Sequence, residues 1–133
     1  MLKLLFVTPK KENLFDLASS LAARGNVEVS WAESGEKALD MISDTSVDLM
    51  VADEELGDMT GLELASRLLR VNPMTNCAMV SALSAEEFHE VSEGLGLIAQ
   101  LPIRPDAEHA EGLLNRLKRL KELGVDLNIG HKT

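Results

Sequence analysis

The chain is short of aromatic residues, cysteine and basic charge, and each shortage narrows what the protein can be. Its 133 residues include one Cys, one Trp, three Phe and no Tyr. Cys77 has no partner for an internal disulfide and lies in an apolar stretch, so we expect a reduced, cytoplasmic setting. With 13 Lys and Arg against 22 Asp and Glu, the formal net charge is −9. This balance argues against nucleic acid as a partner, because phosphate binding needs a basic face.

Long apolar runs and enzyme motifs are also missing. The N-terminal run at residues 4–7 is too short for a signal sequence and is followed by Pro9 and two lysines. No stretch approaches the roughly 20 apolar residues that span a membrane. The sequence contains no GxGxxG, Walker A, HExxH or GxSxG motif, and His89, His109 and His131 show no metal-ligand spacing. We therefore predict a protein that is not an enzyme and does not contact a membrane.

What the sequence does contain is a regular alternation of two kinds of segment. Short apolar runs predict strands at residues 4–7, 27–32, 49–52, 78–80 and 97–101. Helical spacing of apolar residues predicts helices at 14–22, 34–42, 62–69 and 110–123, and Ser84 with Glu87 forms the capping signature of a further short helix. Such alternation predicts a parallel sheet covered by helices on both faces. By itself it indicates a flavodoxin-like or similar α/β fold, a (βα)5 three-layer sandwich.

The segment at residues 48–64 is the most informative part of the chain. The apolar run at 49–52 ends in Asp53, a polar loop containing Gly57 follows, and a helical pattern begins near Leu62. This order places a carboxylate at the carboxyl end of a buried strand, which is where sites form in open α/β sheets.

Four features together resemble the receiver domains of response regulators. They are the Asp53 loop with Gly61, the turn that contains Gly35, the Ser81-Ala82 pair after the fourth strand, and Arg104-Pro105 after the fifth. The resemblance covers residues 1–123 and leaves 124–133 as a C-terminal tail. It implies a five-stranded parallel sheet and a role in two-component signalling. It also implies that Asp53 is the phosphoacceptor, a nucleophilic carboxylate that forms an acyl phosphate, and that Ser81 and Arg104 contact the phosphoryl group.

The sequence differs from the family's pattern at Thr8, Pro9 and Leu101, and the role of Glu55 is open. Thr8 and Pro9 stand where the family has two acids that hold Mg²⁺ with the phosphoacceptor. Because Mg²⁺ requires oxygen ligands, usually carboxylates and phosphate oxygens, we expect weak or absent binding and no resident metal. Leu101 stands where the family has an aromatic switch residue. Glu55, the second residue after Asp53, is either a pocket-edge acid that restores some metal affinity or a solvated loop acid.

Arg104 adds a further expectation about Asp53. A bidentate ion pair between the two side chains would be geometrically natural and would lower the pKa of Asp53. One carboxylate and one guanidinium would nearly balance, so that the site would need no metal. The alternative is that Asp53 is a relic acid tied to a loop N–H or to Arg104.

Two functions remain open at this point. The first is a phosphorelay receiver that is phosphorylated on Asp53 by a sensor kinase or other signalling protein. The alternative is a pseudo-receiver that acts only as a protein interaction module. A third hypothesis, a small flavodoxin-like enzyme, has no support, because the chain contains no phosphate-binding or nucleophile motif. Since 133 residues hold no output module, we expect the domain to act through protein contacts or to be part of a longer protein.

The family commonly binds partners or dimerises through the fourth helix, the fifth strand and the last helix. The last helix carries the densest basic cluster of the chain, formed by Arg116, Lys118, Arg119 and Lys121. These charges suit the negative end of a helix. They also predict contact with an acidic surface, on a partner or on a second copy that offers Glu86, Glu87 and Glu90.

Overall fold

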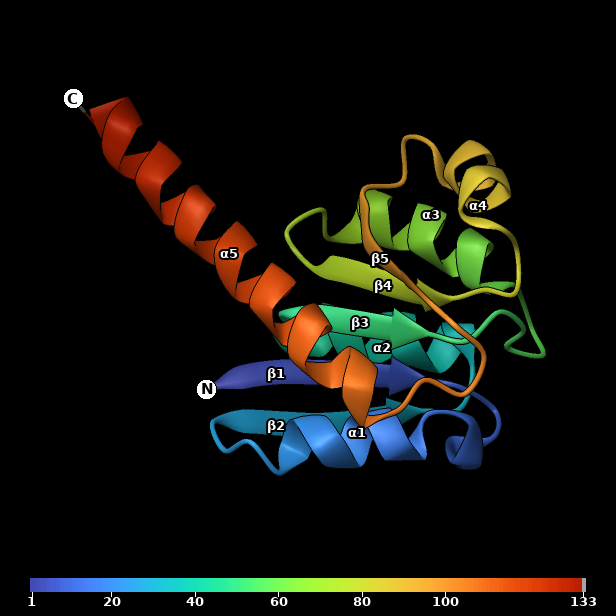
Figure 1. Cartoon of the computed structure of the whole chain (residues 1–133). Coiled ribbons are helices and arrows are strands. Elements are labelled where there is room, and N and C mark those ends of the chain that lie inside the picture. The colour runs from blue at the N-terminus through green and yellow to red at the C-terminus, as the bar shows by residue number, and fades with distance from the viewer. Residues whose placement is uncertain (133) are drawn as a thin grey trace.

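The computed structural model describes the backbone of residues 1–132 and the side chains of residues 1–122. Strands and helices alternate along the chain (Figure 1). The elements are β1 (Leu2–Val7), the 3-10 turn η1 (Lys11–Asn13), α1 (Phe15–Ala22), β2 (Val27–Ala32), α2 (Gly35–Asp44), β3 (Leu49–Ala52), α3 (Gly61–Val71), β4 (Asn76–Val80), α4 (Ala85–Ser92), β5 (Leu97–Leu101) and α5 (Ala107–Lys132).

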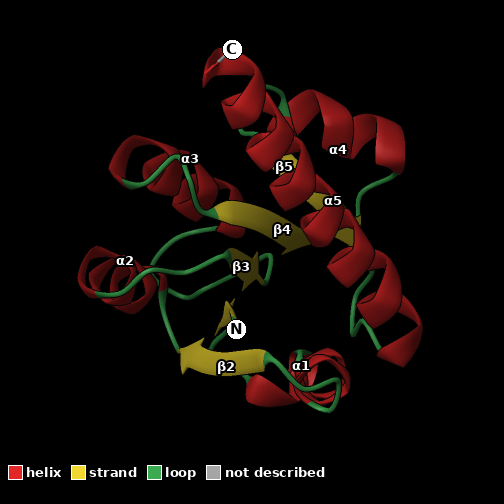
Figure 2. Cartoon of the chain, turned by 90° about the vertical axis from the view of Figure 1, so that its left-hand side faces the viewer, coloured by secondary structure: helices red, strands yellow, loops and turns green. Residues whose placement is uncertain are grey.

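All five strands are parallel and lie in the order β2-β1-β3-β4-β5. Helices cover both faces of this sheet, with α1 and α5 on one side and α2 and α3 on the other (Figure 2). The fold predicted from the alternating pattern, a flavodoxin-like α/β sandwich, is confirmed. Because the strands are parallel, their carboxyl ends meet at one edge, which is where the loops after β1, β3 and β4 lie.

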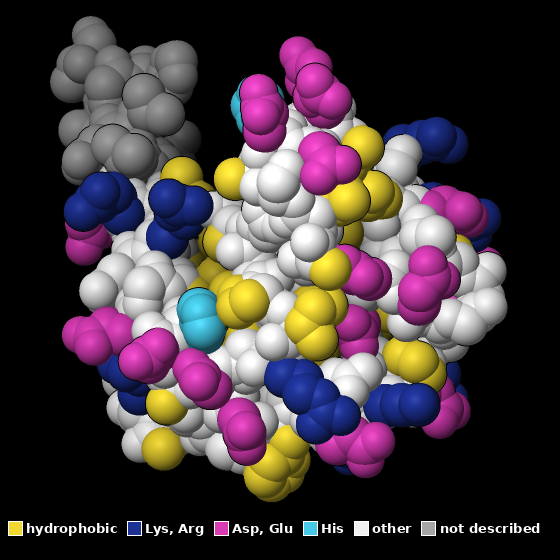
Figure 3. All heavy atoms as spheres, turned by 45° about the vertical axis from the view of Figure 1, so that its right-hand side comes forward, with side chains coloured by type: hydrophobic (Ala, Val, Ile, Leu, Met, Phe, Trp, Pro, Cys, Tyr) yellow, Lys and Arg dark blue, Asp and Glu magenta, His cyan; other side chains and the backbone are white. Residues whose placement is uncertain are grey.

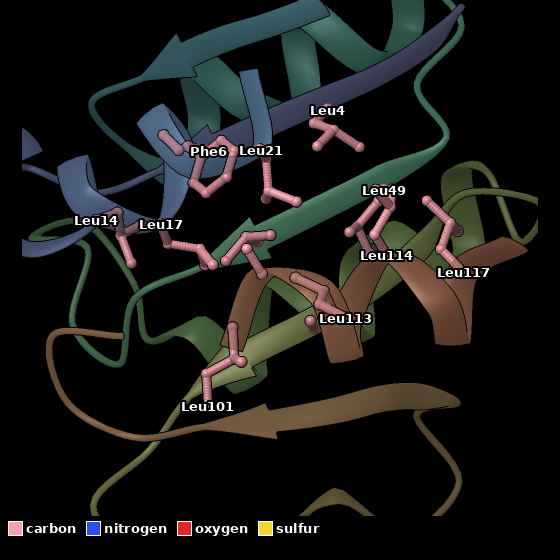
Figure 4. Close-up of a cluster of buried hydrophobic side chains, with 14 of the residues drawn as sticks. Leu4, Phe6, Leu14, Leu17, Leu21, Leu49, Leu101, Leu113, Leu114 and Leu117 are labelled. Atoms are coloured by element: carbon pink, nitrogen blue, oxygen red, sulfur yellow. The ribbon is translucent and has the colours of Figure 1, made fainter. Parts of the chain in front are cut away.

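The core has two halves, one on each face of the sheet. In β1, Leu4 and Phe6 pack toward α1 and α5, while Leu5 and Val7 pack toward α2 and α3, as the two-residue period of a strand requires. In the first half, leucines from α1 and α5 pack against apolar side chains of the strands (Figure 4). Every residue of β3 is buried, which is the pattern of a central parallel strand and holds the residue that follows it firmly in place.

Side-chain caps start three of the helices where the sequence predicts a start. Ser34, Thr60 and Ser84 each accept a hydrogen bond of 3.1 Å from the backbone N–H three residues later. Ser84 also donates to Glu87 Oε1 at 3.0 Å. These bonds satisfy N–H groups that have no partner inside the helix, so the loops that lead into α2, α3 and α4 end at fixed points.

The main difference from the sequence prediction is the length of α5. The helix does not end near Gly124 but continues to Lys132 (Figure 1). A glycine costs a helix only about 1 kcal/mol relative to alanine, and no proline follows it, so the predicted tail at 124–132 is helical. The strands β1 and β4 also begin two residues earlier than predicted. Among the described residues, no helix is both long and apolar enough to span a bilayer.

Candidate functional site

Asp53 lies at the carboxyl edge of the sheet, between the ends of two neighbouring strands. It follows β3 directly, Thr8 follows β1, and Ser81 follows β4. The exposed fractions of the three residues are 9%, 3% and 7%. Their backbone N–H groups extend the sheet ladder: Asp53 N donates to Val7 O at 3.0 Å and Ser81 N donates to Leu101 O at 2.9 Å. The sequence placed these three side chains at one site, and the structure brings their strand ends together there.

The two oxygens of the Asp53 carboxylate have unequal partners. Oδ2 accepts from the Thr8 hydroxyl at 3.0 Å and from Asn13 Nδ2 at 2.9 Å, whereas Oδ1 accepts from the backbone N–H of Glu54 at 2.9 Å. The Thr8 hydroxyl is also 3.0 Å from Lys10 O, so that its single hydrogen has two acceptors. Asn13 is therefore the firmer side-chain donor to Oδ2, and Oδ1 is the less occupied oxygen.

Asn13 was not predicted to belong to the site. It lies at the end of η1, five residues after Thr8, and the 3-10 turn carries its amide over the strand end. Nothing in the local sequence signals this turn, because its residues Lys11, Glu12 and Asn13 show no apolar periodicity. Its position becomes visible only when the loop after β1 folds back over Asp53.

The two acids that follow Asp53 point in different directions. Glu54 is half-buried, and its carboxylate accepts a hydrogen bond from the backbone N–H of Ala82, directly after Ser81. Glu55 is exposed and pairs only through its backbone, in an isolated bridge with Thr60. Of the two alternatives for Glu55, the structure thus agrees with the solvated loop acid, and the acid that contacts the wall of the site is its neighbour Glu54.

Two predicted positions around β5 lie outside the hydrogen-bonded group. Arg104 is exposed, has a φ of 53°, and stands three residues after the end of β5. It is not among the hydrogen-bond or ion-pair partners of Asp53 within residues 1–122, so the expected bidentate pair is not formed. Leu101, the predicted switch position, is buried at 4% exposure where β5 ends. Pro9 is exposed.

The loop between β3 and α3 is held from two sides. Gly61 N donates to Glu54 O at 2.8 Å, and Gly61 lies so close to the backbone that an added Cβ would be 2.4 Å from Asp53 O. Asp58 accepts from the N–H groups of Gly35 and Glu36, both at 3.0 Å, at the start of α2. These N–H groups hold the pKa of Asp58 below its usual value. The loop therefore connects Asp53 to the start of α2.

Among residues 1–122, the arrangement leaves a buried, oriented carboxylate whose Oδ1 has no side-chain donor. Within the described residues, no group of three His, Cys, Asp or Glu side chains is placed to hold a metal ion. A carboxylate in this position can act as a nucleophile at Oδ1.

Comparison with known proteins identifies the family. A family model for the response regulator receiver domain matches residues 5–101. A response regulator receiver protein from Anaeromyxobacter is 31% identical over 102 residues, which are 77% of this chain and 42% of that protein. A protein-glutamate methylesterase/protein-glutamine glutaminase from Halobacterium salinarum is 35% identical over 78 residues, which are 58% of this chain.

The fold comparison agrees with the sequence comparison. The chemotaxis response regulator CheY4 of Vibrio cholerae superposes with a TM-score of 0.78 at 22% identity, covering 88% of this chain and 98% of that one. The present chain spans only 22% of the length of the methylesterase. The chain belongs to the response regulator receiver domain family.

Proposed function

We propose that this receiver domain accepts a phosphoryl group on Asp53 from a sensor kinase or another phosphodonor. The observation that carries the proposal is the carboxylate itself, which lies at the carboxyl edge of the sheet with Oδ1 held by one backbone N–H. Its burial and its hydrogen bonds fix its direction, and positioning, together with electrostatic stabilisation, supplies almost all of the catalysis in phosphoryl transfer. The domain would act by switching and binding rather than by turnover of a substrate.

The proposal includes weak or absent use of Mg²⁺. The residues present do not fit this ion, because Thr8 and Pro9 supply no carboxylate and both side-chain donors to Asp53 point at Oδ2. A metal would have to displace a hydroxyl and an amide in order to reach that oxygen. Mg²⁺ also gives up its water molecules reluctantly, which makes such displacement unfavourable.

Three further positions take proposed roles around the phosphoryl group. Ser81 lies next to Asp53 at the sheet edge and contacts the phosphoryl group through its hydroxyl. Arg104 contributes a cation from the loop after β5. Because Arg104 is exposed and does not contact Asp53 in the unmodified protein, it reaches the phosphoryl group only if that loop moves. Leu101 lacks the ring of an aromatic switch, so the response to phosphorylation must use other residues.

A second function has its own support. Asp53 Oδ2 accepts from both Thr8 and Asn13, as expected for an acid retained for structure. Under this alternative the domain is a pseudo-receiver that binds partners without being phosphorylated. In both cases we propose that a partner or a second copy binds across α4, β5 and α5, where Gly96, Leu97 and Ile98 face the α5 residues Gly112 and Arg119 across a groove.

Phosphorylation can be tested directly with acetyl phosphate. The protein is incubated with this donor in EDTA or in Mg²⁺ and then weighed intact, with Asp53→Asn as the control. We expect one added phosphoryl group in both buffers and none in the variant. A protein that stays unmodified in both buffers would be a pseudo-receiver.

Metal use has a separate test in the same assay. Strong dependence on Mg²⁺ would overturn the metal-independent part of the proposal. Thr8→Asp should restore dependence on Mg²⁺, because it places a second carboxylate against Asp53 Oδ2. Titration calorimetry with Mg²⁺ should give no saturable heat for the wild type and a measurable one for Thr8→Asp.

A further inference from the structure

Glu54 makes contacts in two loops of the site, the one between β3 and α3 and the one between β4 and α4. Its backbone N–H donates to Asp53 Oδ1 at 2.9 Å, and its own carboxylate accepts from the N–H of Ala82. The first contact lies in the loop between β3 and α3, and the second in the loop between β4 and α4, at the same edge of the sheet (Figure 1). One residue therefore holds the nucleophile with its backbone and the neighbouring loop with its side chain.

We propose that Glu54 is an internal anionic latch, which occupies the Ala82 N–H until a phosphoryl group on Asp53 displaces it. The inference rests on the proposed phosphorylation of Asp53. It adds a residue that controls the rate of that reaction and a movement that the reaction causes. Nothing in the sequence pattern singles out Glu54, because an acid in a polar loop is ordinarily solvated.

The hydrogen bonds of Asp53 decide on which side the phosphoryl group is added. Oδ2 is occupied by Thr8 and Asn13, so Oδ1 is the oxygen available for attack. Oδ1 attacks the phosphorus of an acyl phosphate, the O–P bond to Asp53 forms, and the bond from phosphorus to the donor's oxygen breaks. The donor carboxylate leaves with that electron pair, and no proton is transferred. The new group is attached to the oxygen that is hydrogen-bonded to Glu54.

The charge of the new group makes the latch unstable. An aspartyl phosphate carries about two negative charges where the carboxylate carried one. It lies next to the residue whose own carboxylate holds Ala82, and like charges at such short range repel strongly in a partly buried site. Ala82 is exposed, and its N–H remains a strong donor for an acceptor that lies beside it. The phosphoryl oxygens can provide one, so that the N–H passes from one anion to the other.

Release of Glu54 changes what holds the loop between β4 and α4. In the unmodified protein this loop is held by Glu54 through Ala82 and by Gln100 Nε2, which donates to Leu83 O at 2.8 Å. Ser84 then starts α4. Loss of the first contact frees the loop from the β3 side while the contact with β5 remains. The movement would reach the start of α4, next to β5, without an aromatic residue at position 101.

The test separates the charge of Glu54 from its hydrogen bond. Glu54→Gln keeps an acceptor for Ala82 and removes the charge, Glu54→Ala removes both, and Glu55→Gln removes one exposed charge from the adjacent residue as the matched control. We measure the rate of phosphorylation by acetyl phosphate from intact mass. We also measure exchange of the Ala82 amide hydrogen by NMR, without any phosphodonor.

We expect Glu54→Gln to be phosphorylated about tenfold faster than the wild type, since repulsion of the incoming dianion is removed. Glu55→Gln should react at about the wild-type rate. In Glu54→Ala the Ala82 amide should exchange about tenfold faster, because its acceptor is lost, and Glu54→Gln should lie between this variant and the wild type.

Each contrary result has a definite meaning. If the wild type and Glu54→Gln are phosphorylated on Asp53 at the same rate, the latch is wrong and the proposed function stands. Unchanged Ala82 exchange in Glu54→Ala also overturns the latch, since the hydrogen bond is then not formed in solution. If no protein is phosphorylated but exchange accelerates in Glu54→Ala, the proposed function and the displacement step are overturned. In that case the contact is a fixed loop tie only.

Discussion

At the scale of single residues, the site depends on a close approach that only glycine permits. Gly61 begins α3 directly below the Asp53 backbone, and an added Cβ would lie 2.4 Å from Asp53 O. Backbone atoms cannot move aside as the tip of a side chain can. The loop that presents Asp53 therefore requires a residue without a side chain at position 61, whatever the backbone conformation of that glycine.

Replacement of Gly61 by alanine should destabilise the protein and disturb Asp53 together. We expect Gly61→Ala to cost about 2 kcal/mol of unfolding free energy, because overpacked sites typically cost 1–3 kcal/mol. Gly112→Ala is the control, since nothing lies within 4 Å of its added Cβ, and alanine should stabilise this α5 position by up to about 1 kcal/mol. Urea unfolding followed by Trp31 fluorescence measures both. Equal stability of the two variants would show that the loop relaxes freely.

Cys77 provides a residue-scale test of the core. It lies in β4 at 4% exposure, and burial raises the pKa of its thiol to about 12. The reactive thiolate is therefore almost absent at neutral pH. We expect a thiol reagent to label the native protein only as fast as the sheet opens, and to label the protein in urea within the mixing time. Rapid stoichiometric labelling without denaturant would contradict the packing of β4.

The residues of the site were predictable only where a strand fixes them. Asp53, Thr8 and Ser81 each follow an apolar run, so the pattern that predicts the strands also predicts their meeting. Asn13 and Glu54 reach the site from loops, through a 3-10 turn and a side-chain bond to Ala82. Loop paths of this kind depend on tertiary contacts that leave no periodic signal in the sequence.

At the scale of elements, strands and helices follow local patterns, but their ends depend on neighbours. The bounds of β2, β3 and β5 agree with the apolar runs. The strand β1 extends to Leu2 because its partner β2 offers pairing from Val27 onward. The helix α5 passes Gly124 because a single glycine is only a weak stop. Such ends are decided by small energies that the pattern does not contain.

Asp48 is the element-scale tie between β1, β3 and α5. It accepts from Lys3 N at 2.8 Å and pairs with Lys121 Nζ at 2.7 Å. Burial acts to raise its pKa, but the hydrogen bonds from Lys121 and Lys3 and the nearby positive charge outweigh it and lower the pKa below 3.8. Because the folded-state pKa lies below the unfolded one, this stabilisation is present above pH 3.8 and is lost as the pH falls through the folded-state value.

Removal of the Asp48 charge should therefore weaken the protein at neutral pH and matter less in acid. We expect Asp48→Asn to cost about 1 kcal/mol at pH 7, since one charge-assisted hydrogen bond and an ion pair are lost. The difference from the wild type should shrink as the pH falls below 3.8. Asp40→Asn, an exposed acid of α2, is the matched control. Urea unfolding at several pH values measures the difference in unfolding free energy between Asp48→Asn and the wild type. If that difference grows in acid, Asp48 does not have a lowered pKa in the folded protein.

At the scale of the whole molecule, charge and apolar surface are distributed unevenly. The net charge is −9, yet the middle of α5 presents basic residues to both of its flanks. Arg119 lines a groove with Leu97 and Ile98 of β5, whereas Lys118 lines a groove on the other flank with Arg24 and Asp48. Apolar side chains lie exposed between the charged ones (Figure 3). The groove beside β5 thus joins apolar surface to a cation.

Association through the β5 groove should depend on Arg119 and on salt. An acidic surface, such as that formed by the exposed Glu86, Glu87 and Glu90 of α4 in a second copy, complements this cation. Charges at a rim govern association rate and specificity, and they are screened over roughly 10 Å at 0.1 M salt. We expect self-association at low salt, weakened at high salt and in Arg119→Glu. Lys118→Glu makes the same charge change on the other flank of α5 and should associate like the wild type.

Sedimentation of the three proteins at low and high salt measures these differences. Arg119 suits the comparison better than Arg116, because Arg116 also donates to Ile98 O and its loss would disturb β5. Equal weakening by Arg119→Glu and Lys118→Glu would mean that net charge, not the groove, controls association. If the wild type remains monomeric at low salt, a second copy does not bind in this groove. The basic residues would then be solvated side chains of the middle of α5, because the helix continues to Lys132 and its negative end lies beyond them.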